Sequence, residues 1–85
     1  MAPENTALML FRNAIEPLTR DRIEFPEAAR IHDWLTAAPS ERATMFGSIW
    51  QTTEALLGKV KKRPDLADVS DRLVAAWSEV NRVFI

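Results

Sequence analysis

The sequence predicts an all-α protein, a small bundle of three to four helices in which residues 1–85 form a single helical domain. Three observations predict this fold class. A chain of 85 residues has room for one domain. Pro17, Pro26, Pro39 and Pro64 separate stretches in which apolar residues recur every three or four positions, as they do on one face of a helix. In the last two of these stretches, the apolar residues also pair with one another if the chain folds back at Pro64.

The first helix is predicted from about residue 5 to residue 16. Leu8, Phe11 and Ile15 follow the helical spacing. Pro17 should end or kink this helix, because its ring clashes with the preceding turn. The neighbouring Met9 and Leu10 are also apolar, so the helix is apolar around most of its circumference. Such a helix requires cover on more than one side.

A second helix is predicted to begin at Pro26, because proline is favoured at the first helical position. Just before it, Ile23 and Phe25 alternate with Glu24, which predicts a short extended segment laid on the core. The apolar face of this helix should consist of Ile31, Trp34, Leu35 and Ala38.

The third and fourth helices, at about 41–62 and 66–84, are predicted to form an antiparallel αα-hairpin. If the chain folds back at Pro64, facing residues should have position numbers with a constant sum. A sum of about 130 pairs large apolar residues with apolar partners and places the small Thr53 opposite the bulky Trp77, as close helix packing requires. The expected pairs are Phe46–Phe84, Trp50–Val80, Thr53–Trp77, Leu57–Leu73 and Val60–Val69.

Residues able to carry catalysis or hold a metal are scarce. The chain has no cysteine, and its single histidine, His32, cannot form an ordinary zinc site. No nucleophile motif surrounds a serine, and the two glycines form no phosphate-binding loop. We therefore expect a protein that is not an enzyme, with no cofactor and no metal.

The densest charge run is the basic cluster of Lys59, Lys61, Lys62 and Arg63, which includes every lysine of the chain. These cations could contact phosphates. They also lie at the end of a helix, where positive charge is favoured, and the net charge of −1 is unlike that of most nucleic-acid-binding domains. Binding of nucleic acid through this cluster is therefore an alternative rather than the preferred hypothesis.

The preferred hypothesis is a protein-binding module, such as a small inhibitor, an immunity or antitoxin-like protein, or an adaptor. Hydrophobic residues make up 47% of the chain, and a domain of this size buries only a modest share of its surface. The first helix would then contact a partner protein or a second copy in a homodimer, and a self-assembling structural subunit is a further alternative. The residues expected at the interface are Met9, Arg12, Trp34, Val83 and Ile85. Of the three tryptophans, Trp34 is expected to be partly exposed, whereas Trp50 and Trp77 are expected in the core of the hairpin.

Neither a membrane span nor a secretory signal is expected, since Met1–Glu4 lacks a basic region and no long apolar run follows. A cytoplasmic location fits these features and the absence of cysteine. The charged loop Lys62–Asp65 between two amphipathic helices resembles the loop of type III secretion needle subunits. The resemblance is limited to this loop, because the polar helix faces of that family are absent, and the sequence identifies no family.

Overall fold

The structure, a computed structural model, describes the backbone of residues 3–84 and the side chains of residues 5–83. All regular secondary structure in this part of the chain is helical, and the predicted small all-α bundle is confirmed. The elements are the helices α1 (Pro3–Ile15), α2 (Pro26–Leu35), α3 (Pro39–Lys61) and α4 (Ala67–Phe84), with 3-10 turns η1 (Glu16–Leu18) and η2 (Pro64–Leu66).

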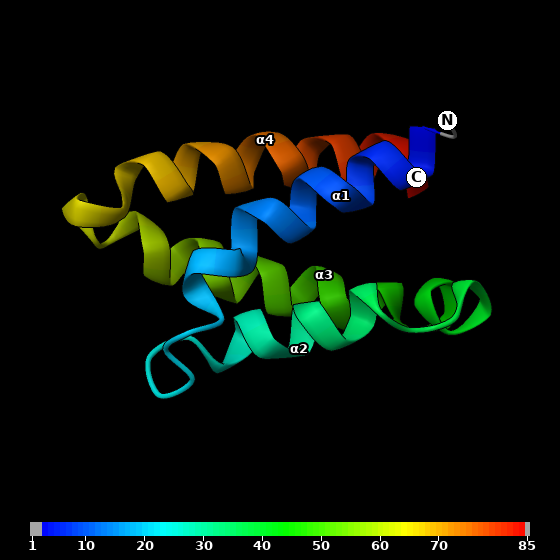
Figure 1. Cartoon of the computed structure of the whole chain (residues 1–85), viewed down its shortest axis with the longest axis horizontal. Coiled ribbons are helices and arrows are strands. Elements are labelled where there is room, and N and C mark those ends of the chain that lie inside the picture. Colours follow the sequence, from blue (N-terminus) through cyan, green and yellow to red (C-terminus); the bar gives the residue numbers. More distant parts are fainter. Residues whose placement is uncertain (1–2, 85) are drawn as a thin grey trace.

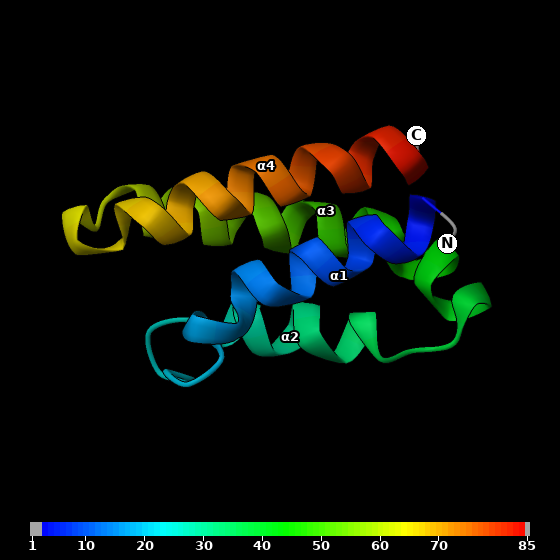
Figure 2. The same cartoon turned by 45° about the horizontal axis from the view of Figure 1, so that its top comes forward.

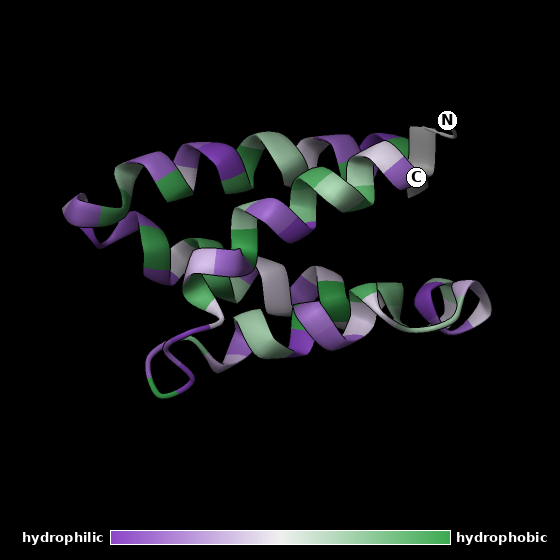
Figure 3. Cartoon of the chain, viewed as in Figure 1, coloured by the Kyte–Doolittle hydropathy of each residue, from purple (hydrophilic) through white to green (hydrophobic). Residues whose placement is uncertain are grey.

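The four helices form two closely packed pairs. α1 packs mainly against α4, and α2 packs mainly against α3. Figures 1 and 2 show α1 between α4 and α2, with α3 behind it. α3 and α4 meet at the Pro64 turn as the predicted C-terminal hairpin. In Figure 3 hydrophobic and hydrophilic segments alternate along the helices, as expected of amphipathic helices that share one core.

The prolines set the helix boundaries, as the sequence predicts. Pro26 is the first residue of α2, as predicted, and Pro39 is the first residue of α3, which begins two residues before the expected start at about residue 41. Proline is tolerated there because the first backbone N–H groups of a helix lack an intrahelical acceptor. Pro17 ends α1 and lies inside η1, while Pro64 opens η2.

A cluster of four aromatic rings joins all four helices at the centre of the core. The ring centroid of Phe11 from α1 lies 6.4 Å from that of Trp34 from α2 and 5.3 Å from that of Trp77 from α4. Phe46 from α3 completes the cluster, at 6.1 Å from Trp34 and 5.9 Å from Trp77. Edge-on and tilted ring pairs at these distances add to the stability that apolar burial provides.

The expected exposure of two tryptophans is wrong. Trp34 was predicted to be partly exposed, but it is only 1% exposed, and its indole N–H donates a hydrogen bond to the Arg42 carbonyl oxygen at 2.9 Å. Trp50 was predicted in the core, but it is 42% exposed. The buried face of α3 is centred on Ile49 and Thr53, so Trp50 falls outside it.

The burial of side chains along the hairpin agrees with the predicted pairing only near the turn. Both members of the pairs Leu57–Leu73 and Thr53–Trp77 are buried, and Val60 is buried while Val69 is partly buried. Farther from Pro64 the pairing fails, because Trp50 is exposed while its expected partner Val80 is buried. The side chain of Phe84 lies outside the described residues, and Phe46 contacts Trp77 instead. α1 and α2 contribute Phe11 and Trp34 to the core at this level, so α3 and α4 do not face each other alone.

The loop before α2 is a series of turns rather than the expected extended segment. Phe25 is buried as predicted, but Ile23 is 96% exposed. The Asp21 side chain accepts hydrogen bonds from the backbone N–H groups of Ile23 and Glu24, at 3.2 and 3.0 Å. This local capping favours a tight turn. The turn directs Ile23 away from the core.

Candidate functional site

Along α1, two large apolar side chains remain outside the core. Met9 is 53% exposed and Leu10 is 46% exposed, although both lie in the middle of the helix. The opposite face of α1 supplies Ala7, Phe11 and Ile15 to the core. Since α4 and α2 cover the flanks of α1, Met9 and Leu10 border grooves on its two sides.

The first of these, the α1–α2 groove, is a hollow of about 200 Å³ lined by Asn5, Leu8, Met9, Arg12 and Leu35. Leu8 and Leu35 are partly buried against the core and supply apolar wall. The groove brings together two of the residues that the sequence predicts to bind a partner, Met9 and Arg12. It thus combines an apolar hollow with a positive charge at its edge.

Arg12 is exposed in the last turn of α1, and none of the described residues forms an ion pair with it. An arginine in this setting can donate several hydrogen bonds to one carboxylate. Met9 beside it has a flexible, polarisable side chain that adapts to irregular apolar surfaces. The pair can contact a partner that presents an apolar group next to an acid.

The other three residues predicted at the interface do not join this groove. Trp34 is buried, and its expected exposure is therefore wrong. Val83 is partly buried and packs against the core near the end of α4. Ile85 lies outside the described residues.

The basic cluster is partly neutralised by carboxylates within the chain. The Lys59 ammonium group contacts the Glu27 carboxylate at 2.8 Å and donates a hydrogen bond to the Glu24 carbonyl oxygen at 3.1 Å. Arg63 forms ion pairs with Glu24 and, at 2.8 Å, with Asp65. These contacts fasten the loop before α2 to the end of α3.

The pKa values of these acids reflect the same contacts. Burial raises the pKa of Glu27, but the hydrogen bond from Lys59 and the nearby positive charges outweigh it, so the pKa lies below its ordinary value of 4.5. The hydrogen bond from Arg63 lowers the pKa of Asp65. Both groups stay ionised at neutral pH and compete with any phosphate for Lys59 and Arg63. Lys61 and Lys62 are exposed and remain accessible to an anion.

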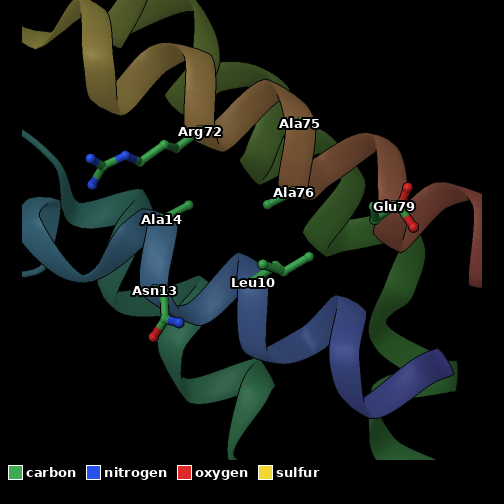
Figure 4. A pocket seen from close by; sticks show the side chains of 7 residues that line it. All are labelled: Leu10, Asn13, Ala14, Arg72, Ala75, Ala76 and Glu79. Atoms are coloured by element: carbon green, nitrogen blue, oxygen red, sulfur yellow. The ribbon is translucent and has the colours of Figure 1, made fainter. Parts of the chain in front are cut away.

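Two further exposed features are not indicated by the sequence patterns. One is Ile23 at the loop tip, for which the Asp21 turn chemistry is the available signal. The other is the α1–α4 groove, about 330 Å³, which joins residues more than 50 positions apart. It is lined by Leu10, Asn13, Ala14, Arg72, Ala75, Ala76 and Glu79. Figure 4 shows Leu10 and Ala14 from α1 facing Ala76 from α4, with Arg72 and Glu79 toward the two ends.

Within the described residues, no group of three or more His, Cys, Asp or Glu side chains is placed to hold a metal ion. His32 is half buried on α2, one turn before its end. None of the helices in the described part of the chain is long and apolar enough to span a membrane.

No protein-family model matches this chain, and no curated protein and no solved structure matches it. The features of the described residues that can indicate a function are therefore the grooves beside α1 and the basic cluster.

Proposed function

We propose that this chain is a non-enzymatic protein-binding module that contacts its partner through the α1–α2 groove. The observation that carries the proposal is the position of Met9, half exposed at the edge of an apolar hollow beside Arg12, which forms no ion pair with a described residue. A large apolar side chain next to an arginine is typical of the centre of protein interfaces. The absence of cysteine suits action in the cytoplasm.

The size of the groove favours a protein side chain over a small-molecule ligand. Its volume of about 200 Å³ is below the range of about 300–1,000 Å³ that is usual for small-molecule sites. An inserted leucine or phenylalanine side chain would fill the space between Leu8 and Leu35. A carboxylate on the same partner segment would reach Arg12. The partner is expected to present such an apolar and acidic pair.

The ion pairs of the basic cluster disfavour the alternative in which this chain binds nucleic acid. Lys59 and Arg63 already contact carboxylates, which leaves Lys61 and Lys62 as the freely accessible cations of the cluster. Two phosphate contacts give only a weak interaction that is lost as salt increases.

The proposal is tested with Met9→Glu and the matched control Met45→Glu, in which a methionine of similar exposure on α3 is replaced. Tagged wild-type and variant chains are used to capture proteins from the native host, and captured proteins are identified by mass spectrometry. We expect a partner that binds the wild type and Met45→Glu but not Met9→Glu. Arg12→Glu should weaken its binding as well.

Circular dichroism establishes that each variant retains its helices before the comparison. If every captured protein binds Met9→Glu and Arg12→Glu as well as it binds the wild type, the α1–α2 groove is not the contact surface. Equal loss in Met9→Glu and Met45→Glu would also contradict the proposal, because these residues lie on different helices.

A further inference from the structure

The sulfur atoms of this chain all belong to methionines, because cysteine is absent. Met1 lies outside the described residues. Met9 on α1 is 53% exposed, and Met45 on α3 is 45% exposed. Methionine is more often buried than exposed, so both thioethers are accessible to a dissolved oxidant to an unusual degree. A peroxide that reaches this protein meets thioethers and no thiolate.

The two exposed methionines have different surroundings. Met9 lines the α1–α2 groove together with Arg12, and the spacing of three residues places these two side chains on one face of α1. Arg12 forms no ion pair with any described residue. Met45 lines hollows on the α2–α3 side of the molecule, which share no residue with the α1–α2 groove. Met45 is therefore a matched control for Met9.

Oxidation of methionine by hydrogen peroxide transfers one oxygen atom to the sulfur. A lone pair of the thioether sulfur attacks a peroxide oxygen, and the S–O bond forms as the O–O bond breaks. The proton on the transferred oxygen passes to the departing hydroxide, which becomes water. Sulfur is oxidised to the sulfoxide, and the peroxide is reduced. Reductases that oxidise thiols to disulfides return the sulfoxide to the thioether and release the oxygen as water.

We propose, on the basis of the proposed function, that Met9 is a site of reversible oxidation whose sulfoxide closes the α1–α2 groove to the partner. The sulfoxide replaces an apolar side chain at the edge of the groove by a polar one. Its oxygen carries partial negative charge and accepts a charge-assisted hydrogen bond from Arg12. One reaction thus removes both the apolar contact and the accessible arginine that the partner requires.

The fold tolerates this change because Met9 lies outside the core. The opposite face of α1 supplies Ala7, Phe11 and Ile15 to the core, whereas half of the Met9 side chain already faces solvent. A polar group at an exposed position costs little, whereas a sulfoxide in a packed core disrupts it. Oxidation of Met9 therefore alters the groove without unfolding the helices, as a reversible switch requires.

The experiment treats the wild type, Met9→Leu and Met45→Leu with hydrogen peroxide and locates the sulfoxides by peptide mapping and mass spectrometry. Leucine keeps an apolar side chain and has no sulfur. Circular dichroism should show that the treated chains keep their helices. In NMR spectra the Nε–H signal of Arg12 should shift on oxidation of the wild type and Met45→Leu, but not of Met9→Leu. Treatment with both classes of methionine sulfoxide reductase, one for each epimer, should restore the signal.

Partner binding supplies a second measurement. A protein captured by the untreated chain should bind the oxidised wild type about tenfold more weakly and should bind oxidised Met9→Leu as before. Unchanged binding to the oxidised wild type overturns the proposal and leaves the proposed function intact. Equal loss in oxidised Met9→Leu, or an Arg12 signal that does not respond to the Met9 sulfoxide, also overturns it. Failure to capture any partner contradicts the proposed function alone, and the Arg12 signal still tests the sulfoxide contact.

Discussion

Replacement of Thr53 by valine is expected to stabilise the protein. Thr53 is completely buried in α3, and its hydroxyl oxygen has no hydrogen-bond partner among the described residues. A buried hydroxyl without a partner has lost its bonds to water and gained none in return. Valine has nearly the same shape and replaces this hydroxyl by a methyl group.

The size of the effect follows from the missing hydrogen bond. Leaving a buried polar group without a partner costs about 1–3 kcal/mol. The two residues have similar helix propensities, so the backbone contributes little to the difference. We expect Thr53→Val to raise the free energy of unfolding by about 1–2 kcal/mol. For a domain of this size, each kcal/mol raises the melting temperature by about 4–8 °C.

Urea denaturation followed by circular dichroism measures this free energy directly. Thr53→Ser serves as the matched control, because it keeps the hydroxyl and removes the methyl group. It should lose about 1 kcal/mol of stability from the lost apolar contact. If Thr53→Val is less stable than the wild type, the hydroxyl has a favourable interaction in the folded state and the reasoning is refuted.

The other two predictions concern the tryptophans and the ion pair between Glu27 of α2 and Lys59 of α3. Trp34→Phe should lower the free energy of unfolding, measured by urea denaturation, by about 2 kcal/mol, because it removes the hydrogen bond to the Arg42 carbonyl oxygen and leaves a cavity. Trp50→Phe should lower it by less than about 0.5 kcal/mol, because Trp50 is exposed. Acrylamide should quench the tryptophan fluorescence of the wild type more than that of Trp50→Phe, because the variant lacks the exposed indole. Because the pKa of Glu27 is lowered in the folded protein, its ion pair with Lys59 stabilises the fold above about pH 4.5, and this contribution disappears as the pH falls through the folded pKa. Glu27→Gln should flatten this part of the stability profile against pH.

These two predictions have clear contrary outcomes. Equal destabilisation by Trp34→Phe and Trp50→Phe would mean that the burial of the two rings is not different. An unchanged pH profile in Glu27→Gln would mean that its carboxylate gains nothing from Lys59 in the folded state. Lys59→Gln removes the same ion pair and should reproduce the flattening.

The positions of the helices could be predicted because the signals for them are local. A proline disrupts the helix before it and favours a first turn after it, wherever the rest of the chain lies. Pro26 and Pro39 therefore locate the starts of α2 and α3. The hairpin near Pro64 could be predicted for a similar reason, since consecutive amphipathic helices joined by a short turn bury their apolar faces against each other.

The exposure of individual side chains could not be predicted from periodicity alone. Trp34 and Trp50 both lie beside apolar neighbours, and the apolar stripe of each helix is wider than the part that becomes buried. Trp34 is buried because Phe11 and Phe46 approach it from two other helices. Local spacing contains no information about those partners.

The candidate sites were also only partly predictable from the sequence. The sequence by itself identified α1 as carrying more apolar surface than a small bundle covers, and it singled out Met9 and Arg12. The tertiary structure was needed to show that Met9 and Arg12 lie beside Leu35 in one groove. It was also needed to show that Leu10 borders a second groove, between α1 and α4. Helix formation depends on residues three or four positions apart, whereas a groove depends on which helices pack together. The packing of α1 against α4 joins residues more than 50 positions apart, and it is determined by the shape of the whole core.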